Sequence, residues 1–346
     1  MVREVPKPKD VIEEQVGKKK KPAKKISGEK DSNWNILDRI KPTSAEEFDI
    51  EDCKITLTDV EKEIWKGIPK AQLLEYYHSV SRYILPHLKD RPLSLHVKHK
   101  GPLAPGLYIK DMEGRAHDCA EIFSDRRRHP KEGKRNQIDY LVCNNEATLL
   151  YIINLGCIDL NPWMSRTHDP NSPDFINIDL DPSDNDFNKA IETALAAKEV
   201  LAKSKLNSFV KTSGKTGIHI YIPVTGMSFA EARVCSEQLG DAINNLVPDI
   251  STTKVNIKSR GNKVFIDPSQ NDYADTLASV YSVRPYHIPT VSTPLDWKEI
   301  RVGLDPANFT IDTILRRIKS KGDLFKEVLN HVIAKKNTQA LHKLSI

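Results

Sequence analysis

The sequence has few cysteines and no long apolar run. Its five cysteines among 346 residues are widely spaced, and none forms a Cys-x-x-Cys pair. This pattern argues against a zinc site and favours reduced thiols in a cytoplasm over disulfides. No apolar run approaches the roughly 20 residues that span a bilayer, and the lysine-rich N-terminus lacks the apolar segment of a signal peptide. We therefore expect a cytoplasmic protein without a membrane partner.

Charge is concentrated at one end of the chain. The net charge is +5, and residues 1–30 hold ten Lys/Arg against five Asp/Glu, so the rest of the chain is neutral overall. We interpret residues 1–33 as a basic disordered tail or linker, with a DNA-binding arm as the alternative. Any nucleic-acid surface on the body of the protein must then be a local patch.

Residues 175–182 alternate apolar and polar side chains, which predicts a strand with one face in the core. The other face carries Asp179 and Asp181, roughly 7 Å apart along the backbone, and Pro182 ends the strand. Two such carboxylates repel unless divalent cations lie beside them. The spacing therefore favours a metal site, although Asp-x-Asp-Pro is also a common strand-to-turn sequence.

A polar turn lies between two expected strands at residues 213–217. It combines two glycines with serine, lysine and threonine, so its N–H groups and side chains can hold phosphate oxygens. It is not a Walker loop, because the first glycine of that motif is missing and a strand follows where a helix is needed. His219 would begin the next strand, with its side chain directed to the same side as the phosphate-binding groups of the turn.

A third acid, Asp267, ends another strand and is again followed by proline. Arg260 stands seven residues before it. Each of these residues also has a purely structural interpretation, since Asp267 can end a turn and His219 can be a core histidine. Their joint occurrence favours a metal-dependent nucleotide site, in which acids hold cations and basic groups hold a triphosphate.

Apolar periodicity and turn residues predict the remaining elements. The order β-α-β-β-α-β from 175 to 267 indicates a sheet with helices on one face. Residues 161–163 are expected in a loop, and the basic segment 119–136 is either a solvated loop or a phosphate-binding patch. Helices are expected at 70–86 (ending before Pro86), 146–155, 187–201 (capped by Ser183 or Asp184), 228–246 and about 310–335, and strands at 55–58, 91–97, 106–109, 138–143, 208–212, 218–223 and 263–267.

Residues 179–182, 211–219, 260–271 and 281–284, taken as an ordered set, resemble the polymerase domain of bacterial DNA ligase D. That domain belongs to the archaeo-eukaryotic primase superfamily, and the match covers about residues 53–330. The resemblance implies an α+β, primase-like fold with mixed and antiparallel central sheets and an RRM-like βαββαβ catalytic module flanked by helices. It also implies one domain over 34–346, with a DNA-end-binding part at about 53–160, a catalytic module at about 161–290 and a C-terminal helix at about 310–335.

The same resemblance gives residues expected roles. Asp179, Asp181 and Asp267 would bind two metal ions and carry catalysis. The incoming nucleotide would be held by Ser213, Lys215, Thr216, His219, Arg260, Gln270, Arg284 and Asn161. Lys62 and Lys70 match lysines that bind the 5′-phosphate on the far side of a gap. Both flank an expected helix start, where the N-terminal end of a helix stabilises a bound anion. Leu107 and Tyr108 match an aromatic pair that stacks on template.

The activity implied is template-directed addition of nucleotides at double-strand breaks in non-homologous end joining. Manganese would be favoured over magnesium, and ribonucleoside triphosphates would often be preferred to their deoxy counterparts. The expected partners are DNA ends and gaps carrying a 5′-phosphate, the Ku protein and a ligase domain in cis or in trans, which implies a nucleoid-associated location. A free-standing primase and a non-catalytic end-bridging module are the alternatives.

Three positions depart from the pattern of the family. Asn161 stands in the Asn-Pro-Trp segment where many relatives have histidine. In the phosphate turn the lysine comes one residue early, at Lys215, with Thr216 in its usual place. Leu107 replaces one of the two template-stacking aromatics, so only Tyr108 remains.

Overall fold

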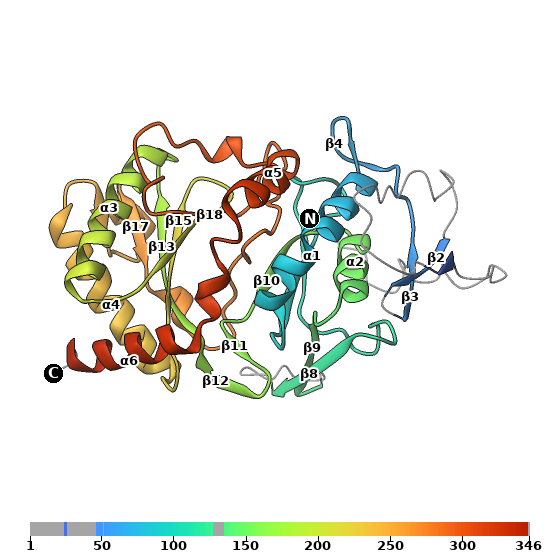
Figure 1. Ribbon diagram of the computed structural model, residues 1–346, viewed down its shortest axis with the longest axis horizontal. Helices are drawn as coiled ribbons and strands as arrows, with labels where there is room; N and C mark the ends of the chain where they lie inside the picture. The colour runs from blue at the N-terminus through green and yellow to red at the C-terminus, as the bar shows by residue number, and fades with distance from the viewer. Residues whose placement is uncertain (1–23, 26–45, 51, 127–134, 345–346) are drawn as a thin grey trace, which may run out of the picture.

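The computed structural model describes residues 24–25, 46–50, 52–126 and 135–344. Figure 1 shows two groups of helices and strands side by side. The elements are β1 Lys24–Lys25, β2 Glu46–Ile50, β3 Cys53–Leu57, β4 Glu63–Trp65, β5 Ile68–Pro69, α1 Lys70–Leu88, β6 Leu93–Val97, β7 Leu107–Ile109, β8 Glu121–Arg126, β9 Gln137–Val142, α2 Glu146–Asn154, β10 Cys157–Pro162, β11 Ser165–Arg166, β12 Asp169–Pro173, β13 Phe175–Pro182, α3 Phe187–Lys203, β14 Phe209–Thr212, β15 Ile218–Pro223, α4 Phe229–Leu246, β16 Ser251–Thr252, η3 Ile257–Ser259, β17 Val264–Asp267, η4 Ser269–Asn271, β18 Pro294–Leu295, η5 Pro306–Asn308, α5 Ile311–Lys321, η6 Lys326–Leu329 and α6 His331–Leu344.

The C-terminal group is built on a six-stranded sheet in the order β16-β17-β13-β15-β14-β18. The pairs β13–β15, β13–β17 and β14–β15 are antiparallel, and β16 lies parallel to β17. The helices α3 and α4 lie on the same side of β13 and β15 (Figure 1). The predicted β-α-β-β-α-β order is confirmed, with helices on one face as expected.

The two faces of β13 enter different cores. Ile176, Ile178 and Leu180 are buried with apolar residues of α3 and α4. Phe175 belongs to a second core, which also contains residues of α1, α2, β6 and β10. Because side chains alternate along a strand, Asp179 and Asp181 lie on the Phe175 side. The acidic face of β13 is therefore the face turned toward the N-terminal half of the chain.

The N-terminal group packs α1 against α2 beside a three-stranded antiparallel sheet, β10-β6-β7. A separate hairpin joins β8 to β9. The expected strands near 55–58, 91–97, 106–109 and 138–143 and the expected helix at 146–155 all correspond to observed elements, with bounds that differ by one or two residues. Of the expected tail at 1–33, the structure describes only β1, which pairs with β2.

Two helix ends differ from prediction. The first long helix was expected to end before Pro86, but α1 continues through it. Ile84 and Leu88 on either side of the proline are fully buried, so packing outweighs the one hydrogen bond that proline removes. The helix α3 is capped by Asp186, whose side chain accepts a hydrogen bond from the Asn188 N–H, and not by either of the two earlier polar residues proposed for that role.

The single helix expected at about 310–335 is two helices. The first, α5, ends at Lys321 and is followed by Gly322, whose φ of +74° is a backbone conformation that favours glycine. The 3₁₀ turn η6 follows, and α6 then begins at His331. In Figure 1, α6 runs along the lower edge of the C-terminal group, and its Leu341 is buried in the core of that group.

Two segments expected as loops contain strands. Asn161 and Pro162 belong to β10, which pairs with β6, and only Trp163 follows the strand. The basic segment 119–136 includes β8, paired with β9. Both strands carry several polar residues, so hydrophobic alternation does not reveal them. Most of the basic side chains of this segment, at 127–134, lie outside the described residues.

The prediction of reduced cysteines is wrong for one pair. Cys53 on β3 and Cys119, just before β8, form a disulfide with their Cα atoms 5.9 Å apart. They are 66 residues apart in the sequence, so spacing alone did not indicate that the fold brings them together. The other three cysteines are buried.

Candidate active site and DNA-end site

The acidic residues form a row across neighbouring strands. Asp179 on β13 lies directly opposite Asp267 on β17 and directly opposite His219 on β15. Asp181 is two residues further along the same face of β13. The Nε2 atom of His219 lies 3.4 Å from Oδ1 of Asp179. The sheet thus brings together the three acids and the histidine that were predicted to share a site.

The carboxylates interact electrostatically. Burial, followed by the charges of Asp181 and Asp267, raises the pKa of Asp179 to about 7. Burial also raises the pKa of Asp181, and Asp267 adds to this while Arg260 opposes it. Negative charge at this edge is therefore incompletely neutralised by the protein.

This donor set suits a hard divalent cation, which prefers carboxylate oxygens. Across the part of the chain that the structure describes, no three acidic, histidine or cysteine side chains already converge as metal ligands do. Asp267 instead accepts hydrogen bonds from the backbone N–H and the hydroxyl of Ser269. The raised pKa of Asp179 nevertheless indicates a charge cluster that a cation would stabilise.

The turn at residues 213–217 lies between β14 and β15, and we call it the phosphate turn after its predicted role. Its first residue, Ser213, closes the turn. Ser213 Oγ accepts hydrogen bonds from the N–H groups of Lys215 at 3.2 Å and Gly217 at 3.0 Å. A Cβ atom at Gly217 would lie 2.6 Å from the carbonyl oxygen of Leu180. Glycine therefore allows the turn to lie directly against the acidic end of β13.

Arg284 packs over this turn. A Cβ atom at Gly214, whose φ is +79°, would lie 2.4 Å from Cγ of Arg284. Burial and the charge of Arg284 lower the pKa of Lys215. The Nε of Arg284 is buried and has no hydrogen-bond partner among the described residues. The turn therefore combines two cations with an unsatisfied donor, as expected of an anion site.

Three of the other predicted nucleotide residues lie around this centre, and Thr216 sits half-buried in the turn itself. Arg260 stacks on the Phe265 ring, with its guanidinium carbon 3.5 Å from the ring centroid, and donates to the carbonyl oxygens of residues 254 and 255. Gln270 Nε2 lies 3.5 Å from Oδ2 of Asp267. Asn161 on β10 contributes to the low pKa of Asp159 through a hydrogen bond.

Two buried residues at the site were not predicted. Asp159, 4% exposed, lies near His96, Arg284 and Asn161, which together hold its pKa below the ordinary value despite burial. Lys211 is completely buried and contacts His219. The signal for Lys211 was present in the sequence, because a short turn between two strands places residues 211 and 219 opposite each other.

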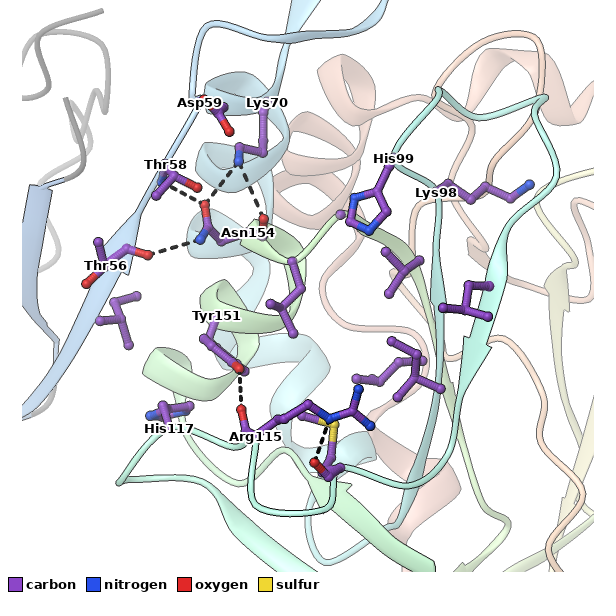
Figure 2. A pocket seen from close by; sticks show the side chains of 18 of the residues that line it. Thr56, Thr58, Asp59, Lys70, Lys98, His99, Arg115, His117, Tyr151 and Asn154 are labelled. Carbon is purple, nitrogen blue, oxygen red and sulfur yellow. Dashed lines mark hydrogen bonds between the residues drawn. The ribbon is translucent and has the colours of Figure 1, made fainter. Parts of the chain in front are cut away.

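A separate cavity of about 770 Å³ lies in the N-terminal half, and Lys62 and Lys70 line it. Lys62 Nζ donates to the His99 carbonyl oxygen at 3.0 Å. Figure 2 shows Lys70 pointing to Asn154, whose Oδ1 and carbonyl oxygen accept at 3.1 and 3.4 Å. Burial lowers the pKa of Lys70 to about 8; Lys62 adds to this, and Asp59 opposes it.

The lining of this cavity is strongly basic. Lys54, Lys98 and Arg115 also line it, and among the described residues of the lining Asp59 is the only acid. The charge of Lys98 also contributes, after burial and Arg284, to the lowered pKa of Lys215 in the turn. The cavity can therefore accept an anion.

Leu107 and Tyr108 are adjacent on β7 and are 54% and 63% exposed. Tyr108 is directly opposite His96 on β6, and the two rings stack with centroids 4.2 Å apart and planes within 2°. His96 Nδ1 lies 3.6 Å from Oδ1 of the buried Asp159. The Tyr108 ring is thus supported by His96 of the neighbouring strand while most of its side chain stays exposed.

The structure is similar to the "Polymerase Domain from Mycobacterium tuberculosis Ligase D in complex with DNA", with a TM-score of 0.71 and 25% identity over 80% of this chain and 98% of that one. The fold is accordingly α+β and primase-like.

The sequence is also similar to those of two LigD proteins. The chain is 30% identical to the bifunctional non-homologous end joining protein LigD of Bacillus subtilis over 84% of this chain and 47% of that protein. It is 26% identical to the multifunctional LigD of Mycolicibacterium smegmatis over 78% of this chain and 35% of that protein. The chain therefore spans half or less of the length of these relatives. Residues 69–325 match the family described as "LigD, primase-polymerase domain", and the chain belongs to that family.

Proposed function

We propose that this chain is a template-directed nucleotidyltransferase that fills gaps and extends DNA ends in non-homologous end joining. The observation that carries the proposal is the row Asp267–Asp179–His219, with the phosphate turn packed against its end. The relatives named above are non-homologous end joining proteins, and the similar solved domain was bound to DNA.

Asp179, Asp181 and Asp267 would hold two divalent cations, with manganese favoured over magnesium. When bound, such ions lower the pKa of an attacking hydroxyl and stabilise the departing pyrophosphate. The burial of Asp179 supports this role, because a partly buried, crowded carboxylate binds a cation more readily than it carries an isolated charge.

The protein's own groups orient the nucleotide. Ser213, Lys215 and Arg284 form the anion site against the end of β13. His219 remains neutral, because burial, Lys211 and Arg284 hold its pKa well below the ordinary value. The neutral ring keeps one N–H group, which would donate a hydrogen bond to a phosphate oxygen. Thr216, Arg260, Gln270 and Asn161 would complete the contacts to triphosphate and sugar, with ribonucleotides preferred.

The DNA contacts would come from the N-terminal half. Tyr108, backed by His96, offers an exposed ring on which a template base can stack. Leu107 adds apolar area beside it. Lys62 and Lys70 would bind the 5′-phosphate on the far side of a gap, because both ammonium groups reach the cavity and donate to neutral oxygen atoms.

The expected setting is the bacterial nucleoid, with Ku at the DNA end and a ligase domain in cis or in trans. The lengths of the relatives support the presence of further domains in those proteins. Within the described residues, no helix combines the length and apolarity needed to cross a bilayer.

Primer extension on a gapped duplex with a 5′-phosphate tests the proposal. Manganese and magnesium, and ribo- and deoxyribonucleoside triphosphates, are compared in the same assay. Templated addition should occur and should be lost in Asp179→Ala. Asp181→Ala should also lose extension while still binding the duplex. Extension that persists in either variant would refute the assignment of the acids.

Two other functions give different results in this assay. A primase that starts chains without a primer would synthesise on a bare single strand. A non-catalytic module that bridges DNA ends would bind the duplex but add no nucleotide with any metal. The presence of all three acids at neighbouring positions of β13 and β17 disfavours the second alternative.

A further inference from the structure

The end of α2 meets the start of α1 at the wall of the basic cavity. Asn154 is the last residue of α2, and Lys70 is the first residue of α1. Ile152 and Ile153, which precede Asn154 on α2, are fully buried, so the helix fixes the backbone at this point. Strand β3 passes on the other side of Asn154 (Figure 2). Three separate elements therefore meet at the side chain of Asn154.

Two backbone groups at the end of β3 fix the orientation of the Asn154 amide. The Thr58 N–H donates to Oδ1 of Asn154 at 3.0 Å, and Nδ2 of Asn154 donates to the Thr56 carbonyl oxygen at 3.0 Å. A backbone N–H can only donate and a carbonyl oxygen can only accept, so exchanging the amide oxygen and nitrogen would break both bonds. The oxygen is therefore the amide atom that faces Lys70.

Both acceptors that the described residues offer to the Lys70 Nζ belong to Asn154. They are Oδ1 at 3.1 Å and the backbone carbonyl oxygen at 3.4 Å. This carbonyl is one of the last four of α2, which have no partner within the helix, and the C-terminal end of a helix favours a cation. Below its pKa of about 8, Lys70 has three N–H donors. One donor therefore remains for a ligand in the cavity that Lys70 lines.

We propose that Asn154 is a positioning residue that holds the Lys70 side chain at the cavity wall, in place to bind an anion. The proposal rests on the proposed function only for the identity of that anion, the 5′-phosphate of a DNA end. A lysine side chain is long and flexible, so holding it in place before the ligand arrives lowers the entropic cost of binding. Asn154 would act through Lys70.

A direct contact between Asn154 and the anion would give a different result. Asn154 also lines the cavity, and its Nδ2 has a second hydrogen beyond the one donated to Thr56. If that hydrogen bound the phosphate, Asn154 would contribute to recognition even without Lys70. If Asn154 acts by positioning, its contribution depends wholly on Lys70. A double-mutant cycle separates the two cases.

The cycle measures the preference of the full chain for a 5′-phosphate. This preference is the ratio of the Kd values for gapped duplexes that carry a 5′-hydroxyl and a 5′-phosphate. Asn154→Leu has a similar volume but lacks the amide, and it should lower the ratio by roughly 10-fold. In Lys70→Met, the same replacement should lower the ratio no further. An unchanged ratio in Asn154→Leu, or an equal loss in both backgrounds, would overturn the proposal.

Asn337 on α6 provides a matched control. Its Oδ1 accepts from the Asn207 N–H at 2.9 Å, and its Nδ2 donates to the carbonyl oxygens of Asn207 and Pro223 at 2.9 Å each. Asn337 thus connects a helix to other segments as Asn154 does, but none of these three residues lines the cavity. Asn337→Leu should lower the free energy of unfolding and keep the ratio. An equal fall of the ratio in Asn337→Leu would attribute the effect to lost stability and overturn the proposal. Alanine replaces leucine at both positions if either variant does not fold.

Labelling of lysines without DNA gives a second readout. Each protein is treated briefly with acetic anhydride at pH 7, and mass spectrometry compares the acetylation rate of Lys70 with that of the exposed Lys66. Because Lys70 is 5% exposed, it should react slowly in the unmodified protein and in Asn337→Leu, and roughly 10-fold faster in Asn154→Leu. An unchanged rate in folded Asn154→Leu would overturn the proposal. If the unmodified protein binds both DNA ends equally, the assignment of Lys70 to the 5′-phosphate fails, whereas labelling still decides whether Asn154 holds Lys70.

Discussion

Asp179 and Asp267 lie directly opposite each other on the antiparallel strands β13 and β17. Like charges at such a position destabilise a sheet, and the pKa of Asp179 is raised to about 7, chiefly by burial and then by Asp181 and Asp267. The pair therefore weakens the fold when both carboxylates are ionised. A bound cation would reverse this effect, which connects the stability of the sheet to the proposed chemistry.

The first prediction concerns stability without metal. The folded chain holds the Asp179 proton up to about pH 7, whereas the unfolded chain releases it near the ordinary value of 3.8. The resulting stabilisation is complete below pH 4 and is lost as the pH rises through 7. In chelator, the free energy of unfolding should therefore fall between pH 4 and 8, by roughly 4 kcal/mol at most from this group.

Urea unfolding of Asp179→Asn checks this prediction. The variant should lack this part of the pH dependence and be more stable than the unmodified protein at pH 8. Asp249→Asn, which changes an exposed acid, should behave like the unmodified protein. Manganese should stabilise the unmodified protein more than Asp179→Asn. Identical pH profiles for all three proteins would contradict the electrostatic description of the row.

The second prediction concerns recognition of the 5′-phosphate. The pKa of Lys70 is lowered to about 8 by burial, so its positive charge is present at pH 7 and largely lost by pH 9. The preference for a gapped duplex with a 5′-phosphate over one with a 5′-hydroxyl should therefore decrease across this range. Fluorescence anisotropy at both pH values measures it.

Two variants control this binding measurement. Lys70→Met should abolish the preference and its pH dependence, whereas Lys66→Met, which removes an exposed lysine outside the cavity, should retain both. Equal losses of affinity for phosphorylated and unphosphorylated ends in Lys70→Met would show that Lys70 does not recognise the phosphate.

The third prediction concerns the template. Tyr108 is exposed and stacked on His96, so Tyr108→Ala should weaken binding of a template overhang by about 1–3 kcal/mol, whichever base it carries. Tyr108→Phe keeps the ring and should bind normally. Titration of a fluorescent overhang measures both, and an alanine variant with unchanged affinity would exclude stacking at this position.

The fourth prediction concerns the disulfide between Cys53 and Cys119. It closes a long loop, so reduction should lower the free energy of unfolding by about 2–4 kcal/mol. Thermal unfolding with and without reductant measures the loss. Cys53→Ser should show the lower stability in both conditions. If both cysteines of the unreduced, folded protein react with an alkylating reagent, the bond is absent.

The core of the candidate site could be predicted because its signals are local. The alternation in 175–182 requires only that a strand has two faces, and β13 has the expected bounds and faces. The glycines at 214 and 217 indicated a tight turn, which the close approaches of Arg284 and Leu180 explain. The order of strands and helices then restricted the sheet to a few arrangements.

The sequence by itself thus determined the acidic strand, the phosphate turn and the order of the elements, since each depends on residues within about ten positions. The tertiary structure alone decided which residues meet across longer separations. It paired Asp179 with Asp267, placed His96 beneath Tyr108, joined Cys53 to Cys119 and buried Lys211 among Ala278 and Ser292. Such contacts depend on packing between distant segments, and side-chain periodicity carries no information about them.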